Sequence, residues 1–182
     1  MSDLAVDPPA PGDPEQDLGD PAAVARAICL RLLGQRARSR SELADALARR
    51  GVPDDAAAAV LDRFTEVGLI DDTALAEGLA GAQHRERGLA RRAVAMKLRQ
   101  RGLDDDTVQA AVAGIDGESE RVRARELVAR RRRALTGLPP EVQARRLVGL
   151  LARKGYAPGL AYELVKAELA GTADVMSAEA PE

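Results

Sequence analysis

A six-residue stretch occurs three times in this chain at nearly constant spacing, and it limits the possible folds more than any other feature. The copies are L-A-R-R-G-V at 47–52, L-R-Q-R-G-L at 98–103 and L-A-R-K-G-Y at 151–156. Their glycines are 51 and 53 residues apart. Self-similarity at such a period indicates a tandem array of one supersecondary unit. We therefore expect the copies to occupy equivalent positions in three structural repeats.

Each copy carries the pattern of a helix C-terminus. A leucine lies four residues before the glycine and another apolar residue lies eight before it, which is the spacing of one helical face. Arg or Lys occupies the last turn, where cations face the negative end of the helix dipole. Glycine has no Cβ and can close a helix in a left-handed conformation. One such pattern is an ordinary helix stop, whereas three in register predict a recurring module.

The composition favours helices over strands. Apolar residues make up 46% of the 182-residue chain, aromatic residues make up only 2%, and alanine and leucine dominate. Strands are enriched in β-branched and aromatic residues, whereas alanine and leucine have high helix propensities. We predict an all-α protein whose core is formed by thin helix-on-helix packing.

Composition shifts and helix-start signals divide the chain into five segments. Residues 1–20 and 171–182 are acidic and poor in large apolar residues, so we expect disordered tails there. The segments 21–70, 71–116 and 117–170 each contain three amphipathic stretches. They predict three tandem three-helix, helix-turn-helix-like repeats that form an elongated, curved array.

Several positions test this reading of the sequence in detail. Pro21 is expected to begin a helix whose inward face includes Val24 and Ala27. Asp71 is expected to cap the helix that follows it. In the third repeat, the first helix is expected to direct its apolar positions inward; these are Ala124, Leu127, Val128 and Leu135.

The charge of the chain is unevenly distributed. The formal net charge is −2, yet residues 1–21 contain six acids, residues 171–182 contain three, and neither segment contains Lys or Arg. Residues 22–170 therefore hold the other 20 of the 29 acids and all 27 bases, a net charge of +7. A basic body favours an anionic partner such as a nucleic acid or a nucleoprotein, with a solvated surface that binds no ligand as the alternative.

The features that suggest catalysis or metal binding have simpler explanations. His84 is the only histidine and lies in a polar run, and Cys29 lies in an apolar run where a buried thiol is expected. The aspartates at 104–106 follow a repeated glycine as Asp54 and Asp55 do, which favours helix caps and dipole partners over metal ligands. The sequence contains neither a phosphate-binding loop nor zinc-ligand spacing. We predict no enzyme, no metal site and no cofactor.

The third repeat is the most basic part of the chain. Residues 119–154 contain eleven bases and three acids, and the inward apolar face turns Arg125, Arg132 and Arg133 outward. Arginine binds phosphates in bidentate geometry, while the scarcity of aromatic residues argues against a platform that stacks single-stranded bases. The candidate binding surface is a basic stripe from Arg121 to Arg146.

The sequence resembles the RecX family of regulatory proteins over about residues 22–170. Besides the first repeated stretch, the resemblance rests on A-I-C-L-R-L-L-G-Q-R-A-R-S-R-S-E-L at 27–43 and G-L-I-D-D-T-A-L-A at 68–76. It also rests on G-L-A-R-R-A-V-A-M-K-L-R-Q-R-G-L at 88–103. The order and spacing of these segments are specific, although each alone is a common helix motif.

The resemblance implies a modulator of RecA that lies in the groove of the RecA nucleoprotein filament and suppresses ATP hydrolysis, coprotease activity and strand exchange in recombination, DNA repair and the SOS response. It implies weak, non-specific binding to single- or double-stranded DNA by a monomeric protein. The sequence itself has no apolar run long enough to span a bilayer, no signal-peptide pattern and a single cysteine, so we expect a cytoplasmic protein without a membrane partner. The alternative from another class is a helix-turn-helix transcription regulator that binds duplex DNA. The expected contact residues are Arg36, Arg38, Arg40, Arg125, Arg132, Arg133, Arg145 and Arg146.

Overall fold

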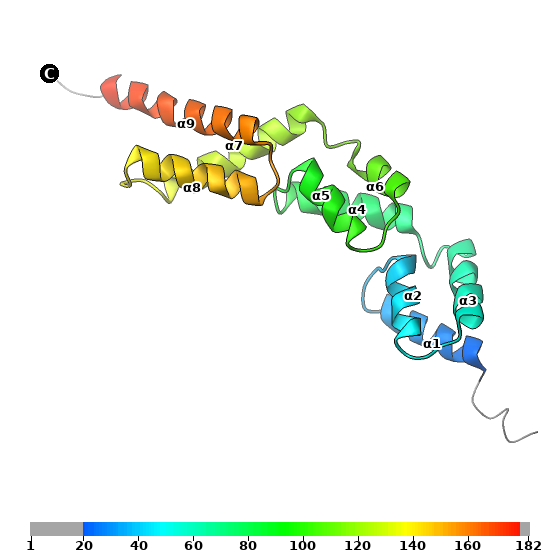
Figure 1. Cartoon of the computed structure of the whole chain (residues 1–182). Coiled ribbons are helices and arrows are strands. Elements are labelled where there is room, and N and C mark those ends of the chain that lie inside the picture. Colours follow the sequence, from blue (N-terminus) through cyan, green and yellow to red (C-terminus); the bar gives the residue numbers. More distant parts are fainter. Residues whose placement is uncertain (1–19, 179–182) are drawn as a thin grey trace, which may run out of the picture. The chain divides into compact units, whose positions relative to one another are not determined.

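The computed structural model of this chain describes residues 20–178, with the backbone alone for 171–178, and in this part every regular element is a helix (Figure 1). The all-α prediction is therefore confirmed. The helices pack in three groups of three, α1–α3, α4–α6 and α7–α9. Their bounds are α1 (Pro21–Leu33), α2 (Arg40–Ala48), α3 (Asp54–Glu66), α4 (Asp72–Arg85), α5 (Arg91–Arg99), α6 (Asp105–Val112), α7 (Gly117–Arg133), α8 (Pro140–Arg153) and α9 (Pro158–Ala178).

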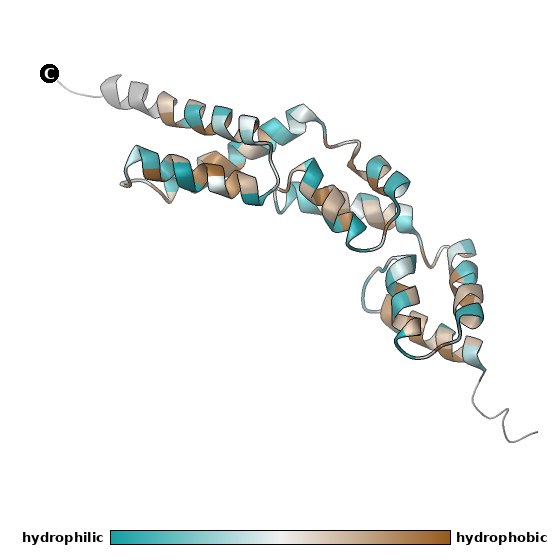
Figure 2. Cartoon of the chain, viewed as in Figure 1, coloured by the Kyte–Doolittle hydropathy of each residue, from teal (hydrophilic) through white to brown (hydrophobic). Residues whose placement is uncertain are grey.

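The helices belong to two compact units. The first unit combines the residues up to 38 with 42–70, and the second combines residues 39–41 with those from 71 onward. The first unit has one core, which includes Cys29 and Phe64. The second unit has one core in α4–α6 and another around α7–α9. The colouring in Figure 2 shows hydrophobic and hydrophilic residues alternating along most of the helices.

The three repeated glycines adopt the left-handed conformation that the sequence predicts. The φ angles of Gly51, Gly102 and Gly155 are 72°, 73° and 87°. In each copy the glycine amide donates to the carbonyl three residues back, at 3.0, 2.8 and 3.0 Å. The next amide donates to the carbonyl of the repeated leucine, at 3.2, 3.4 and 3.2 Å. This pair of hydrogen bonds is the Schellman motif, which satisfies the last carbonyls of a helix.

The apolar positions of the repeated stretch form the centre of each core. The three leucines four residues before the glycines are at most 1% exposed. The three apolar residues eight positions before the same glycines are fully buried. The residue after each glycine, which is Val52, Leu103 or Tyr156, is also buried. A Schellman motif brings that residue against the helix it has just left. Each stop therefore ends a helix and closes a core at once.

The inward face of α1 differs from the prediction. Val24 is 45% exposed and Ala27 is exposed, whereas Ala25 and Cys29 are fully buried. Because α1 is apolar on almost every side, its periodicity does not define a single face. Ala25 and Cys29 belong to the core of the first unit, in which α1 packs against α3. The prediction that Cys29 is a buried thiol is confirmed, and burial raises its pKa.

Aspartates begin several helices, as the sequence predicts. Asp71 caps α4 by accepting from the amide of Ala74 at 2.8 Å, and Asp104 caps α6 by accepting from the amide of Thr107 at 2.8 Å. Hydrogen bonds from Thr107 hold the pKa of Asp104 below its usual value. Asp54 is not a cap, because Pro53 occupies the N-cap of α3, and it lies in the first turn. The described residues contain no cluster of three or more metal-ligating side chains.

The last helix continues beyond its expected end. The acidic tail was expected to begin at residue 171, but α9 extends to Ala178. An internal glycine costs a helix only about 1 kcal/mol relative to alanine, and no proline follows Gly171 until Pro181. The other parts of the expected tails, residues 1–19 and 179–182, lie outside the described residues.

Candidate partner-binding surface

Helix α7 directs one set of its arginines toward α9. Arg121 pairs with Glu163, and Arg132 pairs with Glu168 at 2.9 Å between Nη1 and Oε1. Arg132 also donates to the backbone carbonyl of Glu168 at 3.1 Å. The two arginines are eleven residues apart, which is about three helical turns, so they lie on one side of α7. These two side chains hold α7 and α9 together rather than facing solvent freely.

Another face of α7 contacts the second helix group. This contact is part of the junction between the second and third helix groups, inside the second unit. Arg123 donates to the carbonyl of Arg85, and its Nη1 pairs with Glu126 at 2.6 Å. Nearby, the hydroxyl of Tyr156 donates to the carbonyl of Gly88 at 3.1 Å. The amide of Ala90 donates to the carbonyl of Lys154 at 2.9 Å, and the ammonium group of Lys154 donates to the carbonyl of Arg87. These bonds fix α4–α6 against α7–α9.

Burial shifts the pKa values of two groups at this junction. Desolvation raises the pKa of Tyr156 to about 12, with the charge of Glu120 as a smaller cause. Burial lowers the pKa of Lys154, and the nearby positive charges of Arg130 and Arg123 lower it further. Both side chains nevertheless have hydrogen-bond partners, so the junction is a structural contact and has no groups arranged for acid–base chemistry.

The remaining arginines of α7 lie on a face of the helix that is exposed to solvent. Arg125 and Arg133 are exposed, as are Arg145 and Arg146 on α8, and none of the four guanidinium groups forms a hydrogen bond or ion pair with the described part of the chain. Sequence reasoning selected these four correctly as outward residues. It did not single out three further exposed arginines in the same state, although all three lie within the basic run. We call these seven residues the third-group basic surface: Arg125, Arg130, Arg131, Arg133, Arg145, Arg146 and Arg153.

The other predicted contact residues already interact within the chain. Arg36 pairs with Glu42 at 3.1 Å, and the Nε atom of Arg38 donates to the carbonyl of Leu32 at 3.3 Å. The amide of Arg40 donates to Asp72 at 3.0 Å. Arg132 is bound to Glu168, as described above. The eight predicted residues therefore divide equally, with four exposed on α7 and α8 and four engaged elsewhere.

The remaining candidates for chemistry have structural surroundings. The Nδ1 atom of His84 lies 2.8 Å from the carbonyl oxygen of Leu89, at the end of α4. This contact fixes the turn that Gly88 makes with a φ of 62°. Within residues 20–178, no helix is both long enough and apolar enough to cross a membrane.

Comparison with known proteins places this helical array beside one set of relatives. The family model described as the first three-helix domain of RecX matches residues 25–64, and the model of the second three-helix domain matches residues 71–112. The regulatory protein RecX of Thermobifida fusca is 53% identical over 173 residues, which cover 93% of this chain and 92% of that protein. The protein of the same name from Streptomyces lividans is 49% identical over 158 residues, covering 87% of this chain and 82% of that protein.

Solved structures share the fold. The crystal structure of RecX from Lactobacillus salivarius matches with a TM-score of 0.71 at 16% identity, covering 82% of this chain and 96% of that one. A second crystal structure, of a regulatory protein RecX, matches with a TM-score of 0.68 at 22% identity, covering 81% of this chain and 72% of that one.

Proposed function

This chain belongs to the RecX family of regulatory proteins, and we propose from that membership that it binds the RecA nucleoprotein filament and inhibits RecA. The inhibited activities would be ATP hydrolysis, coprotease activity and strand exchange. The family is one of regulators and not of enzymes, so binding alone must produce the effect. We further propose that the protein acts as a cytoplasmic monomer.

The observation that carries the proposal is the third-group basic surface. Seven arginines on α7 and α8 are exposed, and their side chains have no partner among the described residues, whereas neighbouring arginines such as Arg121 and Arg132 are paired. A surface of this kind can bind the phosphates or acidic side chains of a nucleoprotein without first breaking internal contacts. Contacts made by Arg36 or Arg38 would require each to exchange an existing partner, and they are therefore secondary in the proposal.

A physical mechanism follows from binding without catalysis. A ligand shifts a conformational equilibrium only through a difference in affinity between two states. A protein that spans neighbouring RecA protomers would bind one filament geometry better than others and so hold the filament in it. Inhibition would then require neither an active site nor a cofactor on this chain.

The test is RecA-dependent ATP hydrolysis on single-stranded DNA, titrated with this protein. We expect hydrolysis to fall at amounts of protein at or below one per RecA. Unchanged hydrolysis up to equal stoichiometry would refute the proposal. A separate measurement distinguishes a transcription regulator: sequence-selective duplex binding without RecA would favour the regulator, whereas weak and strongly salt-dependent binding to any DNA fits the filament proposal.

A further inference from the structure

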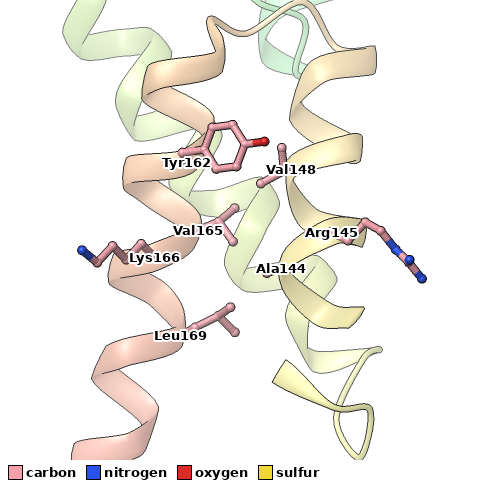
Figure 3. A pocket seen from close by; sticks show the side chains of 7 residues that line it. All are labelled: Ala144, Arg145, Val148, Tyr162, Val165, Lys166 and Leu169. Carbon is pink, nitrogen blue, oxygen red and sulfur yellow. The ribbon is translucent and has the colours of Figure 1, made fainter. Parts of the chain in front are cut away.

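An open groove of about 510 Å³ runs between α8 and α9 in the third helix group (Figure 3). Apolar side chains from both helices form most of its lining, and two cations complete it. Its volume lies in the range typical of sites that accept a ligand or a few anchoring side chains. The lining residues are Ala144, Arg145, Val148, Tyr162, Val165, Lys166 and Leu169.

The apolar part of the groove is exposed in an unusual way. Tyr162 is 65% exposed, the largest value among the large hydrophobic residues of the described chain. Its ring extends across the groove toward Val148, with Val165 beneath it (Figure 3). Tyrosine supplies a large contact area at low cost in conformational entropy, and such side chains are enriched where proteins bind one another. The groove therefore presents an aromatic anchor that the fold itself does not cover.

The two charged residues that line the groove are both positive. Glu163 and Glu168 of α9 are paired with arginines of α7. Lys166 lies on the groove side instead and is exposed, as is Arg145 on the α8 side. Neither cation forms an ion pair or hydrogen bond with the described residues, and no carboxylate lines the groove. An occupant therefore meets an apolar floor between two unneutralised positive charges.

We propose that this groove binds an acidic amphipathic helix of a protein partner. Apolar side chains at i, i+3, i+4 and i+7 would contact Tyr162 and the valines, and carboxylates beside them would pair with Arg145 and Lys166. The cations disfavour a second copy of the same positively charged groove. The groove shares Arg145 with the third-group basic surface, and its apolar floor distinguishes it from the rest of that surface, which suits phosphates. The inference goes beyond inhibition of RecA and does not depend on it.

The test uses the full-length chain and a designed peptide, without RecA or ATP. The probe is a fluorescent helical peptide of about 15 residues, with leucine at the four anchor positions, glutamate at the positions that flank them and alanine elsewhere, and its partner peptide carries lysine in place of glutamate. We expect the glutamate peptide to bind at least about tenfold more tightly than the lysine peptide, as measured by fluorescence anisotropy.

Variants locate the binding and provide the control. Tyr162→Ala should weaken binding of the glutamate peptide by about tenfold, because it removes the exposed anchor without touching the core. Val122→Ala is the matched control, since Val122 is 44% exposed on α7 and lies outside the groove, and it should leave binding unchanged. The double variant Arg145→Glu with Lys166→Glu should reverse the preference and favour the lysine peptide.

Several results would overturn the proposal. Equal binding of the two peptides, no binding of either, or no effect of Tyr162→Ala would each do so. A single-stranded oligonucleotide could displace the peptide, bind more tightly than the peptide and lose affinity on Tyr162→Ala. That result would assign the groove to nucleic acid instead. The same pattern with vesicles of phosphatidylcholine and phosphatidylglycerol would assign it to membranes. Because RecA is absent, failure here leaves the proposed inhibition of RecA untouched.

Discussion

The first and third copies of the repeated stretch have the same backbone but different neighbours. In L-A-R-R-G-V, the guanidinium group of Arg50 donates to the carbonyl of Ala46 in its own helix. In L-A-R-K-G-Y, Lys154 and Tyr156 donate to carbonyls of the second helix group. The two copies differ only at the positions of these donors.

This difference separates two tasks that the repeat performs. The leucine and glycine close a helix in both copies, and that task is architectural. The side chains at the two variable positions either bond within their own helix, as Arg50 does, or join the stop to the preceding helix group, as Lys154 and Tyr156 do. The third copy therefore helps to make α4–α9 one compact unit, while the outward arginines of α7 and α8 stay available for a partner.

The largest expected contrast comes from replacing the glycines. Gly51→Ala should destabilise its unit by about 1–2 kcal/mol, because alanine in the left-handed conformation is strained and nothing lies within 4 Å of the added Cβ. Gly155→Ala should cost about 2–4 kcal/mol, because the Cβ would also lie 2.7 Å from the Cβ of Ala93. Hydrogen exchange of buried amides in α2 and α8 measures the two effects separately. Equal losses at the two sites would contradict the distinction between the stops.

A smaller effect is expected from the hydroxyl of Tyr156. Tyr156→Phe removes the hydrogen bond to Gly88 and leaves a buried carbonyl without that donor, which should cost about 1 kcal/mol in urea-induced unfolding. Tyr162→Phe is the matched control, since that side chain is exposed, and its effect should lie within about 0.5 kcal/mol. If both variants are equally stable, Tyr156 does not secure the junction through its hydroxyl.

The smallest expected effect is on the pH dependence of stability in acid. Hydrogen bonds from Thr107 and Ser119 hold the pKa values of Asp104 and Asp116, the caps of α6 and α7, below the usual value of about 3.9. The folded state therefore binds fewer protons, so this contribution to stability is present above that value and is lost as the pH falls through the lowered pKa. The double variant Asp104→Asn with Asp116→Asn should be less stable than the wild type at pH 7. Its deficit should shrink below about pH 3 in thermal unfolding scans, and a deficit that grew in acid would refute the assignment.

Much of the fold follows from short-range patterns in the sequence. Three glycines after basic turns, with leucines four residues earlier, were sufficient to predict three left-handed stops and the centre of each core. The face of α1 was not predictable in the same way, because a helix that is apolar on nearly every side has no single period. The end of α9 was also missed, since Gly171 weakens a helix without ending it.

The candidate surface was predictable only in part. Arg125 and Arg133 could be placed outward because buried neighbours on α7 define its inner face. Arg132 was expected to face largely outward, and its pairing with Glu168 was not anticipated, because Glu168 lies 36 residues away and periodicity carries no information about such pairs. The junction between the second and third helix groups was not predicted either. The sequence did carry a signal for it, because the third copy has Lys154 and Tyr156 where the first copy has Arg50 and Val52.

The measurement that tests the central claim most directly compares charge reversal of arginines in the third helix group with charge reversal of arginines in the first. One variant carries Arg125→Glu, Arg133→Glu and Arg146→Glu. Its control carries Arg26→Glu, Arg31→Glu and Arg49→Glu, whose side chains are also exposed and have no partner in the described chain. With both variants folded by circular dichroism, each is titrated into RecA hydrolysing ATP on single-stranded DNA. We predict that the third-group variant needs at least about tenfold more protein for half-inhibition, and the control less than about threefold more. Equal inhibition by the two variants would contradict the claim that the arginines of α7 and α8 carry the contact.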